Sequence, residues 1–190
     1  MMPDIDIDFA DRERALSVFK HIKASRIDQN KPVPHNTGVY LHKVPVDAVT
    51  GLSSIDYKTA EEISYFKVDF LNVSIYKDVR DEEHLTHLME TEPLWDLLTE
   101  PAFSDNLFHV AGHSTILQQM KPKSIEQLAA VLAMIRPAKR HLIGQSWDTV
   151  MKSIWTKPTN NEYYFKKSHA TAYAVGVVVH MNLMCELLEN

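Results

Sequence analysis

Aspartates alternate with apolar residues at the start of the chain, in Pro3–Phe9. If this segment is a strand, Asp4, Asp6 and Asp8 share one face, because successive side chains of a strand point to opposite sides. Neighbouring carboxylates repel one another, and aspartate has a low strand propensity. A divalent cation would relieve the repulsion, and oxygen ligands of this kind suit Mg²⁺ or Mn²⁺. The alternative is a solvated acidic edge strand, whose charges prevent aggregation.

A second aspartate motif lies in Phe66–Leu71, which reads Phe-Lys-Val-Asp-Phe-Leu. If this segment pairs beside the first strand, Asp69 supplies a further carboxylate to the acidic face. Such a set of carboxylates holds two metal ions in enzymes that transfer phosphoryl groups by in-line displacement. The two motifs together therefore predict a site for phosphoryl transfer.

Composition limits the class of protein. With 190 residues, the chain has the length of one ordinary domain or two small ones. The net charge of −5 is unfavourable for a protein that grips DNA by itself, because lysine and arginine supply most of that affinity. The single cysteine, Cys185, excludes an internal disulfide. We expect a protein of the cytoplasm with no membrane partner, since no signal peptide is visible and the apolar run at 170–179 is short.

The elements around the two motifs predict a small mixed sheet. Asp11 is placed to cap a helix over Arg12–Ser25, and 26–34 has the composition of a polar loop. Three further strands are expected, at Thr37–Lys43, Gly51–Tyr57 and Ser64–Leu71.

Beyond residue 72 the strand pattern stops. The helices predicted there are bounded by prolines and comprise Val73–Glu90, Ser114–Met120, Ser124–Ile135, Ala138–Trp155 and Ser168–Glu189. We therefore predict an α+β fold, with a palm-like α/β segment at 1–72 and a helical segment at 73–190.

Short blocks in a consistent order resemble the family C bacterial replicative polymerases, the DNA polymerase III alpha subunits. Pro3–Phe9 resembles the PDxDxDF motif of that family, and Phe66–Leu71 resembles its KxDFLG motif. Further blocks resemble HAxGV, the KP pair, ALxRPGP and FNKSHAAAYA, and lie at His35–Val39, Lys121–Pro122, Leu132–Pro137 and Phe165–Ala174.

The resemblance implies roles for individual residues. It makes Asp4, Asp6 and Asp69 the catalytic residues and the ligands of Mg²⁺ or Mn²⁺. Four residues of the second half are expected to bind the phosphates of the incoming nucleotide, namely Arg136, Lys167, Ser168 and His169. Lysine and arginine near a metal site commonly neutralise triphosphate charge, and a helix that starts at Ser168 offers free N–H groups to an anion. A solvated helix end is the alternative for this basic group.

Departures from the family pattern predict a partner chain. The family carries a Gly-Ser-rich element upstream of PDxDxDF that holds the triphosphate, and this chain begins two residues before that motif. The segment between the two aspartate motifs is shorter than in the family, and the fingers are reduced. We expect primed DNA and a deoxynucleoside triphosphate as substrates, with a second polymerase or replisome chain supplying the missing element.

Two other functions remain open at this level. One is a non-catalytic, palm-derived replisome subunit or polymerase regulator, which the acidic net charge favours. The other is a nucleotidyltransferase that acts on a substrate other than DNA and needs no DNA groove.

Overall fold

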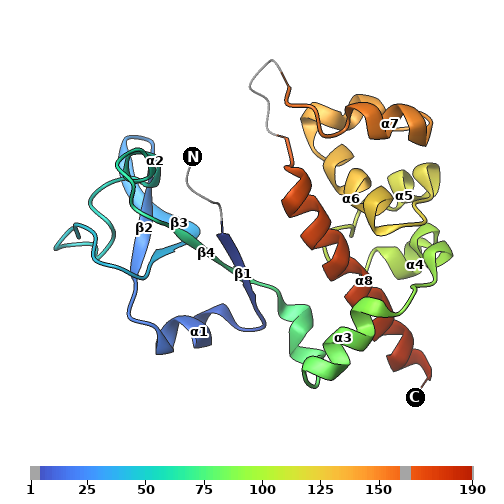
Figure 1. Cartoon of the computed structure of the whole chain (residues 1–190), viewed down its shortest axis with the longest axis horizontal. Helices are drawn as coiled ribbons and strands as arrows, with labels where there is room; N and C mark the ends of the chain where they lie inside the picture. The colour runs from blue at the N-terminus through green and yellow to red at the C-terminus, as the bar shows by residue number, and fades with distance from the viewer. Residues whose placement is uncertain (1–4, 159–163, 190) are drawn as a thin grey trace. The chain divides into compact units, whose positions relative to one another are not determined.

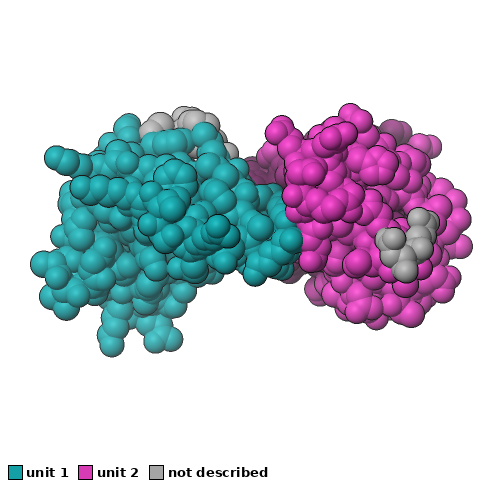
Figure 2. Space-filling model, turned by 90° about the horizontal axis from the view of Figure 1, so that it is seen from below, with its two compact units in different colours: residues 1–77 teal, residues 78–190 magenta. Residues whose placement is uncertain are grey.

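The chain forms two compact units, residues 1–77 and 78–190 (Figure 2). A computed structural model describes residues 5–158 and 164–189. The division falls slightly after residue 72, where the expected boundary lies. The fold is mixed α+β, as predicted, with the sheet in unit 1 and a helical unit 2 (Figure 1).

Unit 1 contains a four-stranded mixed sheet with the order β1-β4-β3-β2. The strands are β1 (Ile5–Phe9), β2 (Ile22–Asp28), β3 (Lys31–Tyr40) and β4 (Val68–Asn72). β1 runs parallel to β4, whereas β4 pairs antiparallel with β3, and β3 pairs antiparallel with β2. The two aspartate motifs, far apart in the sequence, therefore become neighbouring strands.

Two short helices accompany the sheet. Asp11 caps α1 (Arg12–Val18) by accepting a hydrogen bond from Arg14 N, as predicted. Leu16 of this helix packs with buried residues of β3 and β4. The second helix, α2 (Tyr57–Glu62), belongs to a separate apolar cluster that includes Tyr40. Because Tyr40 follows Val39 of the first cluster along β3, the two clusters lie on opposite faces of the sheet.

Three predicted elements of unit 1 are wrong. The helix expected to reach Ser25 ends at Val18, and 22–40 forms the β2–β3 hairpin, where a loop was expected at 26–34. Its turn consists of Gln29 and Asn30, both with positive φ, as in a two-residue type I′ turn. Neither residue is glycine, so the usual sequence signal of this turn is missing. The expected strand at 51–57 contributes only two isolated bridges, Val46 with Ser53 and Ser25 with Asp56.

Unit 2 is built around α6 (Ile125–Met134) and α8 (Lys167–Glu189). Every residue from Leu128 to Met134 is buried, so this part of α6 is apolar on all sides and lies inside the unit. The other helices of unit 2 are α3 (Glu82–Glu90), η2 (Trp95–Thr99), α4 (Pro101–Ser104), α5 (Ser114–Met120), η3 (Pro137–Leu142) and α7 (Trp147–Ser153). A further short helix, η1 (Ser74–Asp78), spans the boundary between the units in the sequence.

The helices of the second half were predicted with mixed success. α5, α6 and α8 agree with their predicted bounds within one residue, and Ser124 caps α6 by accepting from Gln127 N. The single helices expected at 73–90 and 138–155 are each two pieces, a 3₁₀-helix followed by an α-helix.

The helix α8 is long and apolar enough to cross a membrane by length and composition, and no other helix among the described residues is. It packs against α3 and α6, and its residues 177–179 are buried within the unit. The buried Asn182 side chain donates hydrogen bonds to Leu88 O and Thr91 O at the end of α3. Residues of α8 therefore form part of the core of unit 2.

Candidate functional site

Asp6 and Asp69 lie side by side on the neighbouring parallel strands β1 and β4. The two residues are paired in register, so their side chains leave the same face of the sheet. Adjacent strands are about 4.8 Å apart, which brings two such carboxylates within reach of one cation. Asp8 pairs instead with Leu71. Of the aspartates predicted to act together, the structure thus brings together Asp6 and Asp69.

Asp69 is buried, and two side chains donate hydrogen bonds to its carboxylate. The Thr37 hydroxyl donates a hydrogen bond of 2.6 Å to Oδ1, and the Lys67 ammonium group donates to Oδ2. His35 Nδ1 lies 3.7 Å from Oδ1. Lys67 precedes Asp69 by two residues, so both side chains leave the same face of the strand. The orientation of the Asp69 carboxylate is therefore fixed before any ligand binds.

An irregularity of β3 brings His35 and Thr37 to Asp69. Between the pairs Lys23–Val39 and Ser25–Pro34, β2 contributes one residue and β3 contributes the four residues 35–38. The His35 ring closes this bulge, since Nδ1 accepts hydrogen bonds from Thr37 N and Gly38 N. A Cβ on Gly38 would lie 2.6 Å from Lys67 Cδ and 2.9 Å from His35 Nδ1. Because glycine has no Cβ, it leaves room for the side chains of Lys67 and His35, which both lie beside Asp69.

The acidic face continues along β1 to Asp8. Partial burial of its carboxyl group raises the pKa of Asp8, and the charge of Asp6 raises it further, although the residue still reaches solvent. Burial likewise raises the pKa of Tyr76, with a smaller contribution from Asp8. Negative charge is therefore concentrated here at an energetic cost, which a bound cation would reduce.

The residues present fit a hard divalent cation. Asp6 and Asp69 supply carboxylate oxygens, and Mg²⁺ commonly binds through one or two carboxylates, waters and substrate phosphates. Asp4, predicted as a third ligand, lies outside the described residues. Within 5–158 and 164–189, no group of three or more metal-binding side chains is found.

The predicted phosphate-binding residues lie in unit 2 around Phe165. The Arg136 guanidinium carbon is 5.2 Å from the centre of the Phe165 ring, and His169 stacks on that ring at 6.3 Å. Tyr173 stacks on it at 5.5 Å and contacts His109 at 4.2 Å. Burial of the His109 ring among these neighbours and the charge of Arg136 lower the pKa of His109 to about 4, although the residue remains exposed at its edge.

Lys167 and Ser168 occupy the first turn of α8. Both are exposed, and the Lys167 ammonium group lies 3.5 Å from Glu126 Oε1. The four predicted phosphate-binding residues therefore belong to one neighbourhood of unit 2, at the start of α8, whereas Asp6 and Asp69 belong to unit 1.

Comparisons with known proteins give no independent guide to function. No model of a protein family matches the chain, and searches of curated proteins and of solved structures find no significant match. The resemblance to family C polymerases consequently stays a prediction from the quoted motifs.

Thr37 and His109 were missed as site residues. Thr37 reaches Asp69 only through the bulge, and no sequence pattern marks that bulge. His109 contacts Tyr173 across 64 positions of the chain (173 − 109), so its role depends on tertiary packing. The sequence could have placed Lys67 beside Asp69, because it stands two positions earlier in a predicted strand and so lies on the same face.

Proposed function

We propose that the chain is a metal-dependent nucleotidyltransferase that adds nucleotides to a DNA 3′ end in the cytoplasm, together with a partner chain. The observation that carries this proposal is the register of Asp6 with Asp69, which brings the two aspartate motifs onto one sheet face. A row of carboxylates on neighbouring strands is the ligand arrangement that two-metal phosphoryl transfer requires.

Each residue of the site has a defined task in this proposal. Asp6, Asp69 and Asp4 hold Mg²⁺ or Mn²⁺, which when bound activates the attacking hydroxyl and neutralises phosphate charge. The hydrogen bond from Thr37 keeps Asp69 in one orientation. Lys67 neutralises the Asp69 carboxylate through their ion pair and, beside a bound cation, would supply positive charge to the triphosphate.

The second unit contributes phosphate binding. Arg136, Lys167, Ser168 and His169 contact the incoming deoxynucleoside triphosphate, and Phe165 orients Arg136 and His169 from beneath. The net charge of −5 supplies little attraction for DNA, so a replisome or polymerase chain holds the primed template.

The test measures nucleotide incorporation on a primer–template with Mg²⁺ or Mn²⁺. Asp6→Asn and Asp69→Asn are expected to lose at least about a hundredfold in rate, because each removes a carboxylate of the metal site. Asp8→Asn is the matched control, since it changes an aspartate of the same strand that pairs with leucine, and it should retain activity. Equal rates for all three variants would refute the assignment.

The non-catalytic subunit is the second candidate, and the contact between Lys67 and Asp69 favours it. Because the Lys67 ammonium group compensates the charge of Asp69, the acidic sheet face can be stable without a bound metal. Thermal stability that does not change with Mn²⁺ and nucleotide, together with no incorporation, would support this candidate. Metal-dependent nucleotide binding without binding to primed DNA would indicate a substrate other than DNA.

A further inference from the structure

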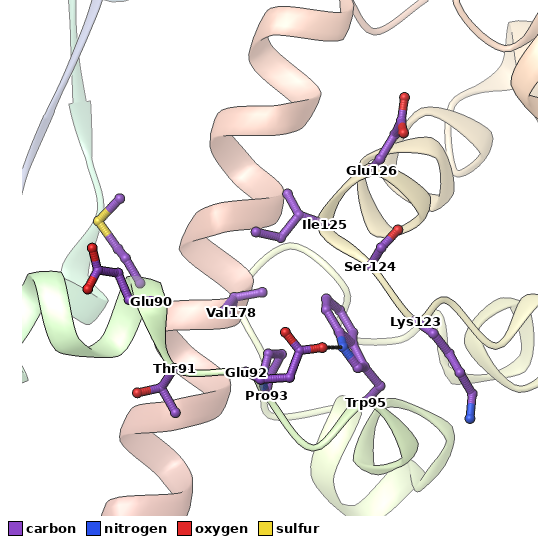
Figure 3. Close-up of a pocket in the computed structure, with 11 residues that line it drawn as sticks. Glu90, Thr91, Glu92, Pro93, Trp95, Lys123, Ser124, Ile125, Glu126 and Val178 are labelled. Atoms are coloured by element: carbon purple, nitrogen blue, oxygen red, sulfur yellow. Dashed lines mark hydrogen bonds between the residues drawn. The ribbon is translucent and has the colours of Figure 1, made fainter.

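Unit 2 contains two adjoining hollows beside Trp95, remote in sequence from the aspartate motifs. One has a volume of about 300 Å³ and lies between the end of α3, the start of α6 and α8 (Figure 3). The other, of about 470 Å³, extends along η2. Both include Pro93, Trp95 and Lys123 in their walls, and we call the two hollows together the Trp95 groove.

The floor of the Trp95 groove is apolar. Ile125 and Val178 line the smaller hollow together with the Trp95 ring (Figure 3). Pro93 and Val178 are buried beneath the surface, whereas Leu94 at the groove keeps 65% of its surface exposed. Covering this exposed leucine with the apolar part of a ligand makes a favourable contribution to the free energy of binding.

The rim of the groove is acidic. Its charged side chains are five exposed acids and one lysine, namely Glu90, Glu92, Asp96, Glu100, Glu126 and Lys123. Lys123 pairs with Asp96 at 3.3 Å, and Lys167 lies near Glu126.

Glu90 and Glu100 pair with no cation among the described residues. Glu92 accepts a hydrogen bond from the Trp95 indole, which fixes the ring and leaves the negative charge uncompensated. The groove thus combines an apolar floor with excess negative charge.

We propose that the Trp95 groove binds a basic segment of a partner protein, in which lysine or arginine alternates with apolar side chains. Charge complementarity selects this occupant, since an acidic rim repels nucleic acid and acidic peptides and attracts cationic side chains. The apolar residues of the segment cover Leu94 and the Trp95 ring, and its cations meet Glu90, Glu92 and Glu100. This inference does not depend on the nucleotidyltransferase proposal.

The experiment measures fluorescence anisotropy of a short labelled peptide in which arginine alternates with leucine. The full chain should bind it saturably, with affinity that falls as salt is raised, and the same peptide with glutamate in place of arginine should not bind. Binding should also change the tryptophan fluorescence, because Trp95 lies at the groove.

Variants distinguish binding of the peptide in the Trp95 groove from general attraction of the peptide to an acidic protein. Leu94→Ser is expected to weaken binding about tenfold, because it removes the exposed apolar contact. Glu92→Gln keeps an acceptor for the indole N–H and removes the charge, so it should weaken binding about two- to fivefold. The matched controls are Val49→Ser and Glu62→Gln, which make the same kinds of change on exposed residues of unit 1 and should have no effect.

Three results would overturn the proposal. They are the absence of saturable peptide binding, equal losses in the control variants, and equal binding of the glutamate peptide. Binding of arginine methyl ester without binding of the peptide would assign the groove to small organic cations and would also overturn it.

Discussion

Replacing Asn182 with leucine should destabilise unit 2 strongly, because one buried amide satisfies two backbone carbonyls. Its Nδ2 donates to Leu88 O at 2.8 Å and to Thr91 O at 2.9 Å, and only 6% of the residue is exposed. Leucine has a similar size and no donor, so Asn182→Leu leaves both carbonyls of the α3 terminus unsatisfied. A buried polar group that loses its partner costs about 1–3 kcal/mol. The hydrogen bond to Leu88 O is buried, whereas the bond to Thr91 O is only partly buried and costs less to lose, so the expected loss of unfolding free energy is about 2–4 kcal/mol.

Urea denaturation followed by tryptophan fluorescence measures this loss. All three tryptophans of the chain, Trp95, Trp147 and Trp155, belong to unit 2, so the signal reports on that unit. With a denaturant slope of roughly 1–2 kcal/mol per M, the midpoint should fall by roughly 1–4 M.

Asn106→Leu is the matched control for Asn182→Leu. Its Nδ2 also donates to a carbonyl, Ala102 O at 2.8 Å, but the residue is exposed and water can replace the bond. We expect a loss below about 0.5 kcal/mol. If Asn182→Leu loses no more unfolding free energy than Asn106→Leu, the stability of unit 2 does not depend on the hydrogen bonds from Asn182 to the two carbonyls. Because the α3 terminus forms a wall of the Trp95 groove, Asn182→Leu should also weaken peptide binding.

Two further predictions concern the fold around the candidate sites. Gly38→Ala places a Cβ against Lys67 and the His35 ring and should lower the unfolding free energy of unit 1 by about 1–3 kcal/mol. Urea denaturation followed by circular dichroism measures this loss, and a value below about 0.5 kcal/mol would contradict the close packing. The pKa values of His35, His109 and His180 are lowered, mainly by burial, so the folded state favours the neutral rings. Protonation then favours unfolding, and the melting temperature should fall as the pH drops from about 6.5 toward 4; a constant melting temperature across this window would refute the prediction.

The sequence by itself determined the elements whose signals are local. Alternating aspartates define β1, Asp11 caps a helix as its position predicts, and the apolar pattern of the last segment defines α8. Hydrogen bonds and side-chain faces within a few residues decide these features, so spacing alone is sufficient.

Only the tertiary structure decided which of these elements meet. The β2–β3 hairpin turns at Gln29 and Asn30, which lack the glycine that usually marks such a turn. The sequence therefore contains no sign of the hairpin, and the first helix was predicted to continue to Ser25, into the segment that forms β2. The Thr37 bond to Asp69 joins residues 32 positions apart across a bulge. The acidic rim of the Trp95 groove likewise gathers side chains from α3, η2 and α6. Contacts of this range are set by packing of whole elements, which one-dimensional periodicity does not encode.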